Sequence, residues 1–338
     1  MKLAEFDFRL PQELIAQFPQ EARDQSRLMV VDRRRGRWEH GLFSDLPDFL
    51  TKDDLLVVND SKVFPARLFA RKEDLGARTE ILLLQREQED IWTGLIKPGR
   101  RAEVGTRLVV HPEHLEIEVL DQGSSAERRL RLFCKGDIWA ALERFGHTPL
   151  PPYIHRPAQP DDRDRYQTVY ARKSGSVAAP TAGLHFTAEL LEKISYCRAR
   201  LDVGYGTFKP MVEEEIEGHE MAAEYYCLAP EAVEKIRYHR SAGGRVVAVG
   251  TTTTRLLEHI FLKHGEVVAD QGLTDLFIRP GFTFGAVEGL ITNFHLPRST
   301  LLMLVAAFAG QDLVKRCYQA AIKERYRFYS YGDCMLIL

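Results

Sequence analysis

Two segments of the chain place a histidine beside an aromatic residue, next to a predicted helix start. Residues 175–186 are rich in small side chains and end in His185 and Phe186, and residues 292–297 contain His295 after a phenylalanine. Small residues let the backbone approach a ligand closely, and such a histidine can stack on a base or move a proton. Hydrogen bonding in the protein interior explains each histidine equally well, so both interpretations stay open.

A third candidate segment is the loop of one glycine and four threonines at residues 250–254, between a predicted buried strand and a helix predicted from Arg255. Its backbone N–H groups, hydroxyls and positive helix end suit an anion or a sugar, although simple helix capping accounts for the threonines equally well. The patterns G-x-G-x-x-G and G-x-x-x-x-G-K-[ST] are missing, which argues against an ordinary dinucleotide site and a P-loop. Residues 59–62 follow another buried strand, where α/β sheets place ligand-binding groups.

The charge balance limits how the chain can hold a polyanion. With 46 basic and 48 acidic side chains the formal net charge is -2, so nucleic acid must be bound by local basic patches. Arg163, Arg165 and Tyr166 together suit contacts to phosphate and to a base. Histidines and cysteines do not occur at metal-ligand spacing, and we expect no metal.

The elements that position these residues fall into two patterns. Buried strands at 54–60 and 245–250 and helices at 255–264, 300–310 and 312–325 indicate α/β structure. Between them, short strands at 80–84, 91–97, 107–110, 115–120 and 129–134, with no helix, indicate a small barrel or sandwich. We therefore predict an α/β main domain with an inserted all-β, barrel-like domain. Residues 1–66 and 150–338 form the discontinuous main domain and residues 67–149 the insertion.

The sequence also predicts the compartment. The 5 cysteines are scattered, which fits reduced thiols in a cytosol. Acidic residues near Met1 do not fit a signal peptide, and the longest apolar run, 301–309, is far shorter than the ~20 residues of a membrane helix. We expect a cytoplasmic monomer that does not bind membranes.

Longer strings carry a family resemblance. They are residues 65–68, 151–154, 166–170, 178–186, 248–252, 292–297 and 326–333. On these strings the whole chain resembles the S-adenosylmethionine:tRNA ribosyltransferase-isomerase family of queuosine biosynthesis. The resemblance implies an α/β domain with an inserted β-barrel, in agreement with the strand and helix pattern.

The resemblance also implies the reaction. The ribosyl part of S-adenosylmethionine is transferred to 7-aminomethyl-7-deazaguanine (preQ1) at the wobble position of tRNA, and rearrangement gives epoxyqueuosine with release of adenine and methionine. S-adenosylmethionine is then a consumed co-substrate, and neither a resident cofactor nor a metal is expected. The partner is tRNA carrying preQ1.

Residue roles follow from this implied route, which begins with loss of a proton from the carbon beside the sulfonium. His185 and His295 are the candidate bases, because histidine exchanges protons near neutral pH. The remaining predicted catalytic residues, which would donate a proton or hydrogen bonds to the departing adenine, are Asn293, Thr181 and Asp275.

Binding roles are expected for a larger set. Phe186 and Phe294 would stack on a base, while Thr251, Thr252 and Arg255 would hold the ribose or the methionine carboxylate. The full set of predicted substrate-binding residues is Ser176, Phe186, Thr251, Thr252, Arg255, Phe294, Tyr166 and Asp60. The predicted tRNA-binding residues are Arg67, Arg163 and Arg165.

The chain departs from the family pattern at two positions. Asp202 and Ala222 stand where members of the family commonly carry histidine. We infer that histidine is dispensable at both positions, and Asp202 becomes a further candidate for a base or a cation partner. Two alternatives stay open: an isomerase or hydrolase acting on a free nucleoside, and a tRNA-binding module without catalysis. Dependence on tRNA separates the first from the main hypothesis, and release of adenine separates the second.

Overall fold

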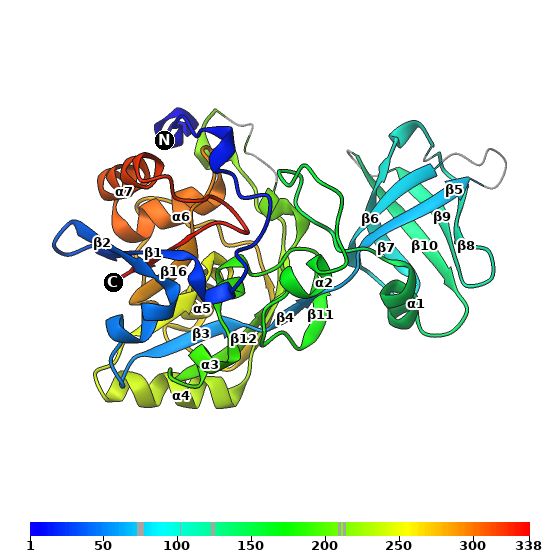
Figure 1. Ribbon diagram of the computed structural model, residues 1–338. Helices are drawn as coiled ribbons and strands as arrows, with labels where there is room; N and C mark the ends of the chain where they lie inside the picture. Colours follow the sequence, from blue (N-terminus) through cyan, green and yellow to red (C-terminus); the bar gives the residue numbers. More distant parts are fainter. Residues whose placement is uncertain (73–77, 102, 123–125, 209–210, 212–213) are drawn as a thin grey trace.

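The computed structural model describes residues 1–72, 78–101, 103–122, 126–208, 211 and 214–338. Figure 1 shows a large sheet surrounded by helices and, beside it, a smaller barrel. The predicted fold class, an α/β main part with an inserted barrel, is therefore confirmed. The chain enters the barrel after β4 (Ser61–Val63), which pairs in parallel with β11 (Lys173–Ser176) after the chain has returned.

The large sheet has the strand order β15-β13-β12-β3-β14-β16-β17-β1-β2. Its strands are β1 (Arg27–Asp32), β2 (Arg37–Leu42), β3 (Leu55–Asn59), β12 (Tyr196–Leu201), β13 (Glu224–Leu228), β14 (Val246–Val249), β15 (Asp270–Thr274), β16 (Gly289–Asn293) and β17 (Cys334–Ile337). Strands β12, β3, β14 and β16 are neighbours and run parallel, so their carboxyl ends meet at one edge of the sheet, the carboxyl edge. Because β17 is antiparallel to β16, the residues that precede β17 reach the same edge.

Both faces of the sheet are covered, as the apolar runs of its central strands predict. Leu55 and Val57 pack in the cluster that contains the helices following β13, whereas Leu56 and Val58 pack in the cluster on the opposite face. The main-part helices are α2 (Asp162–Arg165), α3 (Ala188–Leu191), α4 (Pro230–Ser241), α5 (Thr251–His264), α6 (Thr300–Ala309) and α7 (Gln311–Lys323). The prediction that the helix after β14 begins at Arg255 was wrong, since the threonines already form its first turn.

The barrel is closed, with the strand order β10-β7-β6-β5-β8-β9. Its strands are β5 (Arg67–Lys72), β6 (Arg78–Arg86), β7 (Ile91–Lys97), β8 (Arg107–His111), β9 (Leu115–Gln122) and β10 (Glu127–Cys134). Closure pairs every strand on both sides and removes the exposed edges of an open sheet. The interior is filled by apolar side chains such as Leu68, Ile81 and Leu130.

One helix accompanies the barrel, where the sequence predicted none. This helix, α1 (Ile138–Phe145), begins at Asp137, whose side chain accepts a hydrogen bond from Ala140 N at 2.8 Å. The helix is too short to give a clear periodic pattern in the sequence, although the capping aspartate could have indicated its start. The entering and returning chains pair where Arg67 N donates to His147 O at 3.2 Å and His147 N donates to Arg67 O at 2.8 Å. Residues 67–149 as a separate domain stay a prediction, because strand pairing does not test independent folding.

The described part of the chain contains no helix with the length and apolar character needed to cross a bilayer.

Candidate active site

A narrow cavity, the edge cavity, opens at the carboxyl edge. It brings together Thr181, Thr251, Thr252, Asn293 and His295, which were predicted from separate segments of the sequence. The other residues that line it are Tyr153, Ala179, Pro180, Ala182, Val203, Thr207, Gly250, Thr292, Leu301, Tyr329 and Ser330. Its volume of about 40 Å³ holds roughly three water molecules.

The threonine segment contributes a helix start to this cavity. Gly250 has a φ of 92°, a left-handed conformation that favours glycine, and it turns the chain from β14 into α5. The hydroxyls of Thr253 and Thr254 donate to backbone carbonyls four residues earlier, at 2.8 and 3.2 Å. Thr251 and Thr252 instead line the cavity, where the first N–H groups of a 14-residue helix favour negative charge.

His295 lies in the cavity wall just after β16. Its side chain is 6% exposed, and its Nε2 lies 2.8 Å from Thr292 Oγ1. The phenolic OH of Tyr318 accepts a hydrogen bond from the His295 backbone N at 3.0 Å, which fixes this part of the chain. Burial lowers the pKa of His295 to about 3, so the imidazole is neutral at pH 7 and can accept a proton.

His185 is buried behind the cavity, in the described structure, and is not among the lining residues. Asn293 Nδ2 donates both to Tyr329 O at 3.1 Å and to His185 Nε2 at 3.1 Å. His185 therefore carries its proton on Nδ1 and donates it to Ser26 Oγ at 2.6 Å. Burial lowers its pKa to about 3. Both ring nitrogens are thus engaged in hydrogen bonds within the protein.

Asn293 has an unused acceptor. Within the described chain, its buried Oδ1 has no hydrogen-bond partner, although the amide group lines the cavity. A buried oxygen without a donor is costly, by about 1–3 kcal/mol, and natural proteins rarely leave one unpaired. The oxygen is therefore suited to accept a hydrogen bond from a bound ligand.

Two tyrosines in the wall were not singled out by the sequence. The rings of Tyr153 and Tyr329 lie 3.8 Å apart between centroids, and the Tyr153 hydroxyl bonds to Ser330 Oγ. Tyr329 has a φ of 74°, a conformation that costs a non-glycine residue about 1–3 kcal/mol and is concentrated at functional sites. The family-like strings 151–154 and 326–333 contain both tyrosines and were the available signal.

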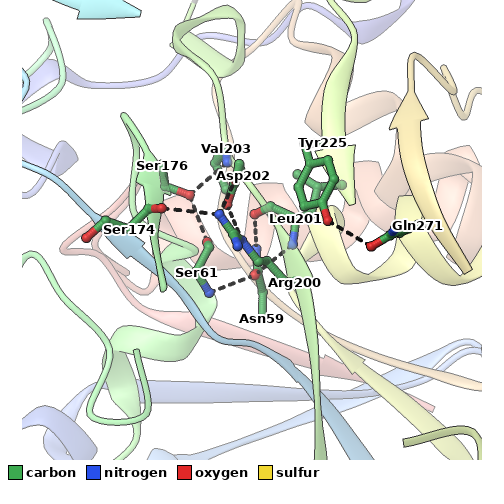
Figure 2. Close-up of polar contacts among 10 residues, drawn as sticks. All are labelled: Asn59, Ser61, Ser174, Ser176, Arg200, Leu201, Asp202, Val203, Tyr225 and Gln271. Atoms are coloured by element: carbon green, nitrogen blue, oxygen red, sulfur yellow. Dashed lines mark hydrogen bonds and ion pairs between the residues drawn. The ribbon is translucent and has the colours of Figure 1, made fainter. Parts of the chain in front are cut away.

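A hydrogen-bond network behind the cavity holds β12, β3 and β11 together (Figure 2). The amide of Asn59 donates to Leu201 O at 2.8 Å and accepts from Leu201 N at 3.1 Å. Ser176 Oγ donates to Ser61 Oγ at 2.8 Å and accepts from Val203 N at 2.8 Å. Ser176, predicted to bind substrate, is completely buried and positions Val203, which does line the cavity.

A second, larger cavity, the junction pocket, lies between the barrel and the main sheet. The barrel side supplies Arg86, Trp92 and Trp139, and the sheet side supplies Asp202 and Glu224. Its volume is about 460 Å³. Val203 lines both cavities, so the junction pocket and the edge cavity adjoin at this residue. Aromatic walls with a few polar groups are typical of small-molecule sites.

Two ion pairs build the sheet side of the junction pocket. Arg200 donates to both carboxylate oxygens of Asp202, at 2.8 and 2.7 Å (Figure 2). Burial raises the pKa of Asp202, and this ion pair opposes the increase. Glu224 pairs with Arg255 and accepts from Gly204 N at 2.7 Å. Arg255, predicted to hold substrate, is 5% exposed, and its positive charge is paired with the carboxylate of Glu224.

The predicted stacking residues lie in the core. Phe186 packs edge-on against Phe43, and Phe294 packs against Tyr326, with centroid distances of 4.9 and 5.3 Å. Tyr166 is completely buried, and burial raises its pKa. In the described structure these three side chains are absent from the walls of both cavities.

The three predicted tRNA-binding arginines and the aspartates Asp275 and Asp60 lie outside the edge cavity. Arg67 donates to Leu150 O at 3.0 Å, Arg163 pairs with Glu143, and Arg165 donates to Glu21 O at 2.8 Å. Asp275 is exposed beyond β15 and does not line the edge cavity within the described residues. Asp60 lies in a separate surface groove along β12.

The two departures from the family pattern lie near one another. Asp202 N donates to Tyr225 O at 2.9 Å, so the segments around positions 202 and 222 run side by side. Ala222 is exposed, and its Cβ would lie 3.8 Å from a Cβ at Gly206. Asp202 lines the junction pocket, and Ala222 is adjacent in sequence to the lining residue Ala223.

The comparisons with known proteins decide the family. Residues 3–337 match the family described as queuosine biosynthesis protein. The chain belongs to this family. The S-adenosylmethionine:tRNA ribosyltransferase-isomerases of Thermoanaerobacter sp. (strain X514) and Symbiobacterium thermophilum are 48% and 50% identical to it, each over 343 residues and the full length of both chains. The family expected from the sequence strings is thereby confirmed.

A solved structure in the family is also similar. The crystal structure of S-adenosylmethionine tRNA ribosyltransferase from Thermotoga maritima is 42% identical, covers 99% of this chain and 100% of its own, and superposes with a TM-score of 0.55. Among the described residues of this chain, no group of three or more His, Cys, Asp or Glu residues could hold a metal ion. The expected absence of a metal or cofactor stays a prediction.

Proposed function

We propose that this chain is an S-adenosylmethionine:tRNA ribosyltransferase-isomerase that carries out its chemistry in the edge cavity. The observation that carries the site assignment is the convergence of Thr251, Thr252, Asn293 and His295 at the carboxyl edge. In open α/β sheets ligands bind outside the carboxyl ends of the strands. The substrates are S-adenosylmethionine and tRNA carrying preQ1, and the products are epoxyqueuosine-tRNA, adenine and methionine.

The polar groups of the cavity match the parts of S-adenosylmethionine. The start of α5, with Thr251 and Thr252, offers N–H groups and hydroxyls to the methionine carboxylate or the ribose. The unpaired Oδ1 of Asn293 can accept a hydrogen bond from the adenine amino group. Thr181, on the facing wall, adds a hydroxyl that can bond the purine as it leaves. These assignments make the cavity a site for the nucleoside part of the donor.

Between the two candidate bases, the geometry favours His295. It lines the cavity and is neutral at pH 7, whereas His185 donates to Ser26 and accepts from Asn293. A pKa of about 3 makes an imidazole a weak base, so the substrate must help proton removal. The sulfonium charge does so by acidifying the neighbouring carbon. His185 becomes a positioning residue for Asn293.

The remaining expectations belong to the same proposal. We propose that the enzyme works as a cytoplasmic monomer with neither a metal nor a resident cofactor. Asp275, Phe186, Phe294 and Tyr166 are not given contact roles in this scheme, because they lie in the core or away from the cavity.

The test is to incubate purified protein with S-adenosylmethionine and tRNA bearing preQ1, and to follow adenine by chromatography and the digested nucleosides by mass spectrometry. We expect adenine together with a nucleoside of epoxyqueuosine mass, and neither product with unmodified tRNA. Adenine release without tRNA would instead indicate a nucleoside hydrolase. Binding of the modified tRNA without either product would indicate a non-catalytic module.

A further inference from the structure

A surface groove of about 480 Å³ runs along β12, next to the junction pocket. The alternation of buried and accessible residues in β12 turns Tyr196, Arg198 and Arg200 toward the groove and Cys197 and Ala199 toward the core. Arg172 and Lys173 at the start of β11 and Lys235 on α4 complete its basic side chains. We call this surface the basic groove.

The groove concentrates positive charge. In its described lining, five basic side chains, of which Arg200 is already paired with Asp202, face two carboxylates, Asp60 and Glu231, although the whole chain has a formal net charge of -2. Arg172, Lys173 and Lys235 are exposed, so their charges are available to a partner. Such a local excess attracts a polyanion that the field of the whole molecule would not.

The arginines in the groove floor are held in place with donors to spare. Arg198 donates to the Tyr196 hydroxyl at 2.9 Å and lies over the Tyr196 ring, 5.0 Å from its centroid. Within the described structure its buried Nε has no hydrogen-bond partner. Fixed guanidinium groups beside tyrosine rings offer contacts to phosphate and stacking surfaces to bases.

The groove is continuous with the junction pocket. Arg200 and Tyr225 line both. Figure 2 shows the Arg200–Asp202 pair and, beside it, Tyr225, whose hydroxyl donates to Gln271. The Arg200 guanidinium lies 5.3 Å from the centroid of the Tyr225 ring. A polymer bound in the groove can therefore place one of its side groups, such as a base, beyond Arg200 and Tyr225 in the junction pocket, which is lined by Trp92 and Trp139.

We propose that the basic groove binds the phosphate backbone of the tRNA anticodon loop and that the target base enters the junction pocket, which adjoins the edge cavity at Val203. The inference rests on the proposed function, which makes tRNA the polyanion. Proteins place nucleic acids chiefly by phosphate contacts, and enzymes that modify a base take it out of its stack into a pocket. Arg163 and Arg165 are less suited to this role, because Glu143 and backbone carbonyls already occupy them.

The experiment compares two charge reversals at exposed pairs. Arg172→Glu/Lys173→Glu changes the groove, and Arg34→Glu/Arg35→Glu, in the turn between β1 and β2 at the opposite end of the sheet, is the matched control. Binding of fluorescent preQ1-tRNA is measured by anisotropy, and folding is checked by thermal unfolding. We expect the groove variant to bind at least ~10-fold more weakly and the control to change at most ~2-fold.

A salt titration identifies the phosphate contacts. The slope of log K against log salt should fall by about 2–3 in Arg172→Ala/Lys173→Ala/Lys235→Ala, because each of the three lost contacts removes about 0.7–0.9. Unchanged affinity, or equal losses in the groove and control variants, would overturn the inference. A wild-type protein that binds tRNA through the groove but releases no adenine would contradict only the proposed function.

Discussion

The edge cavity and the basic groove lie along one stretch of chain, residues 196–207, and hold their polar groups in different charge states. The cavity contains hydroxyls, an amide and a neutral histidine, all largely buried. The groove contains paired and unpaired ions that stay accessible to solvent. The junction pocket between them shares Val203 with one and Arg200 with the other.

Burial explains the difference. A buried charge is tolerated only when it is paired, so the cavity that we propose for the cationic sulfonium is better lined by neutral dipoles, which need no ionic partner. A groove that binds an RNA backbone is open to solvent, where the charged forms of lysine and arginine are hydrated and need no buried partner. The pair Glu224–Arg255 combines features of both regions, because it is ionic like the groove and almost fully buried like the cavity.

The largest effect on stability is expected at the buried Glu224–Arg255 pair. Glu224→Ala leaves the Arg255 charge buried without its partner, and we expect the free energy of unfolding to fall by about 3–5 kcal/mol. Urea unfolding followed by circular dichroism measures it. The control is Glu266→Ala, which breaks the exposed Arg237–Glu266 pair and should cost less than about 1 kcal/mol. Equal costs for the two variants would show that burial does not set the energetics of these pairs.

The next effect, on kcat, tests the role of the neutral histidine in the edge cavity. His295→Ala should lower kcat at least ~100-fold, as loss of a general base does, while tRNA affinity stays within about 2-fold. Adenine release at saturating substrates measures kcat. His239→Ala is the control, because His239 is a partly buried histidine on α4 that bonds Asp53 O at 2.7 Å, outside the edge cavity. A loss of a few-fold or less for His295→Ala would exclude it as the base.

A smaller effect separates the two histidine segments by role. His185→Ala removes a partner from buried Ser26 Oγ and Asn293 Nδ2, and we expect stability to fall by about 1–3 kcal/mol. His185→Asn should recover part of the stability and part of the activity, as expected for a positioning residue. If His185→Asn were stable but as inactive as His295→Ala, His185 would have to act on the substrate itself.

The smallest effect is a pH dependence. Folding lowers the pKa of His295 from about 6.5 to about 3, so the unfolded state binds the extra proton between these values. The stability linked to neutral His295 is therefore complete above pH 6.5 and is lost as the pH falls toward 3, at up to ~1.4 kcal/mol per pH unit. The stability difference between wild type and His295→Asn should shrink over this window in urea unfolding at pH 7, 6 and 5. A constant difference would contradict it.

Local sequence determined the elements of this protein. The apolar runs that became β3 and β14, the alternating runs that became the barrel strands, and the glycine that turns β14 into α5 were all legible. Each depends on residue type and spacing over a few positions, which is where hydrophobic periodicity and turn chemistry act. The short helix α1 was not predicted, because an apolar pattern that lasts only about two helical turns cannot be told from a loop in the sequence.

Tertiary structure alone decided which predicted residues share a cavity. His185 and His295 have similar neighbours in sequence, yet only the parallel order of β14 and β16 and the antiparallel return of β17 place one in the cavity wall and the other behind it. The packing of the sheet also buries Phe186 and Phe294 in the core, and the position of β12 beside β3 and β13 turns Arg198 and Arg200 outward. Strand order joins residues more than a hundred positions apart, so no local pattern can contain it.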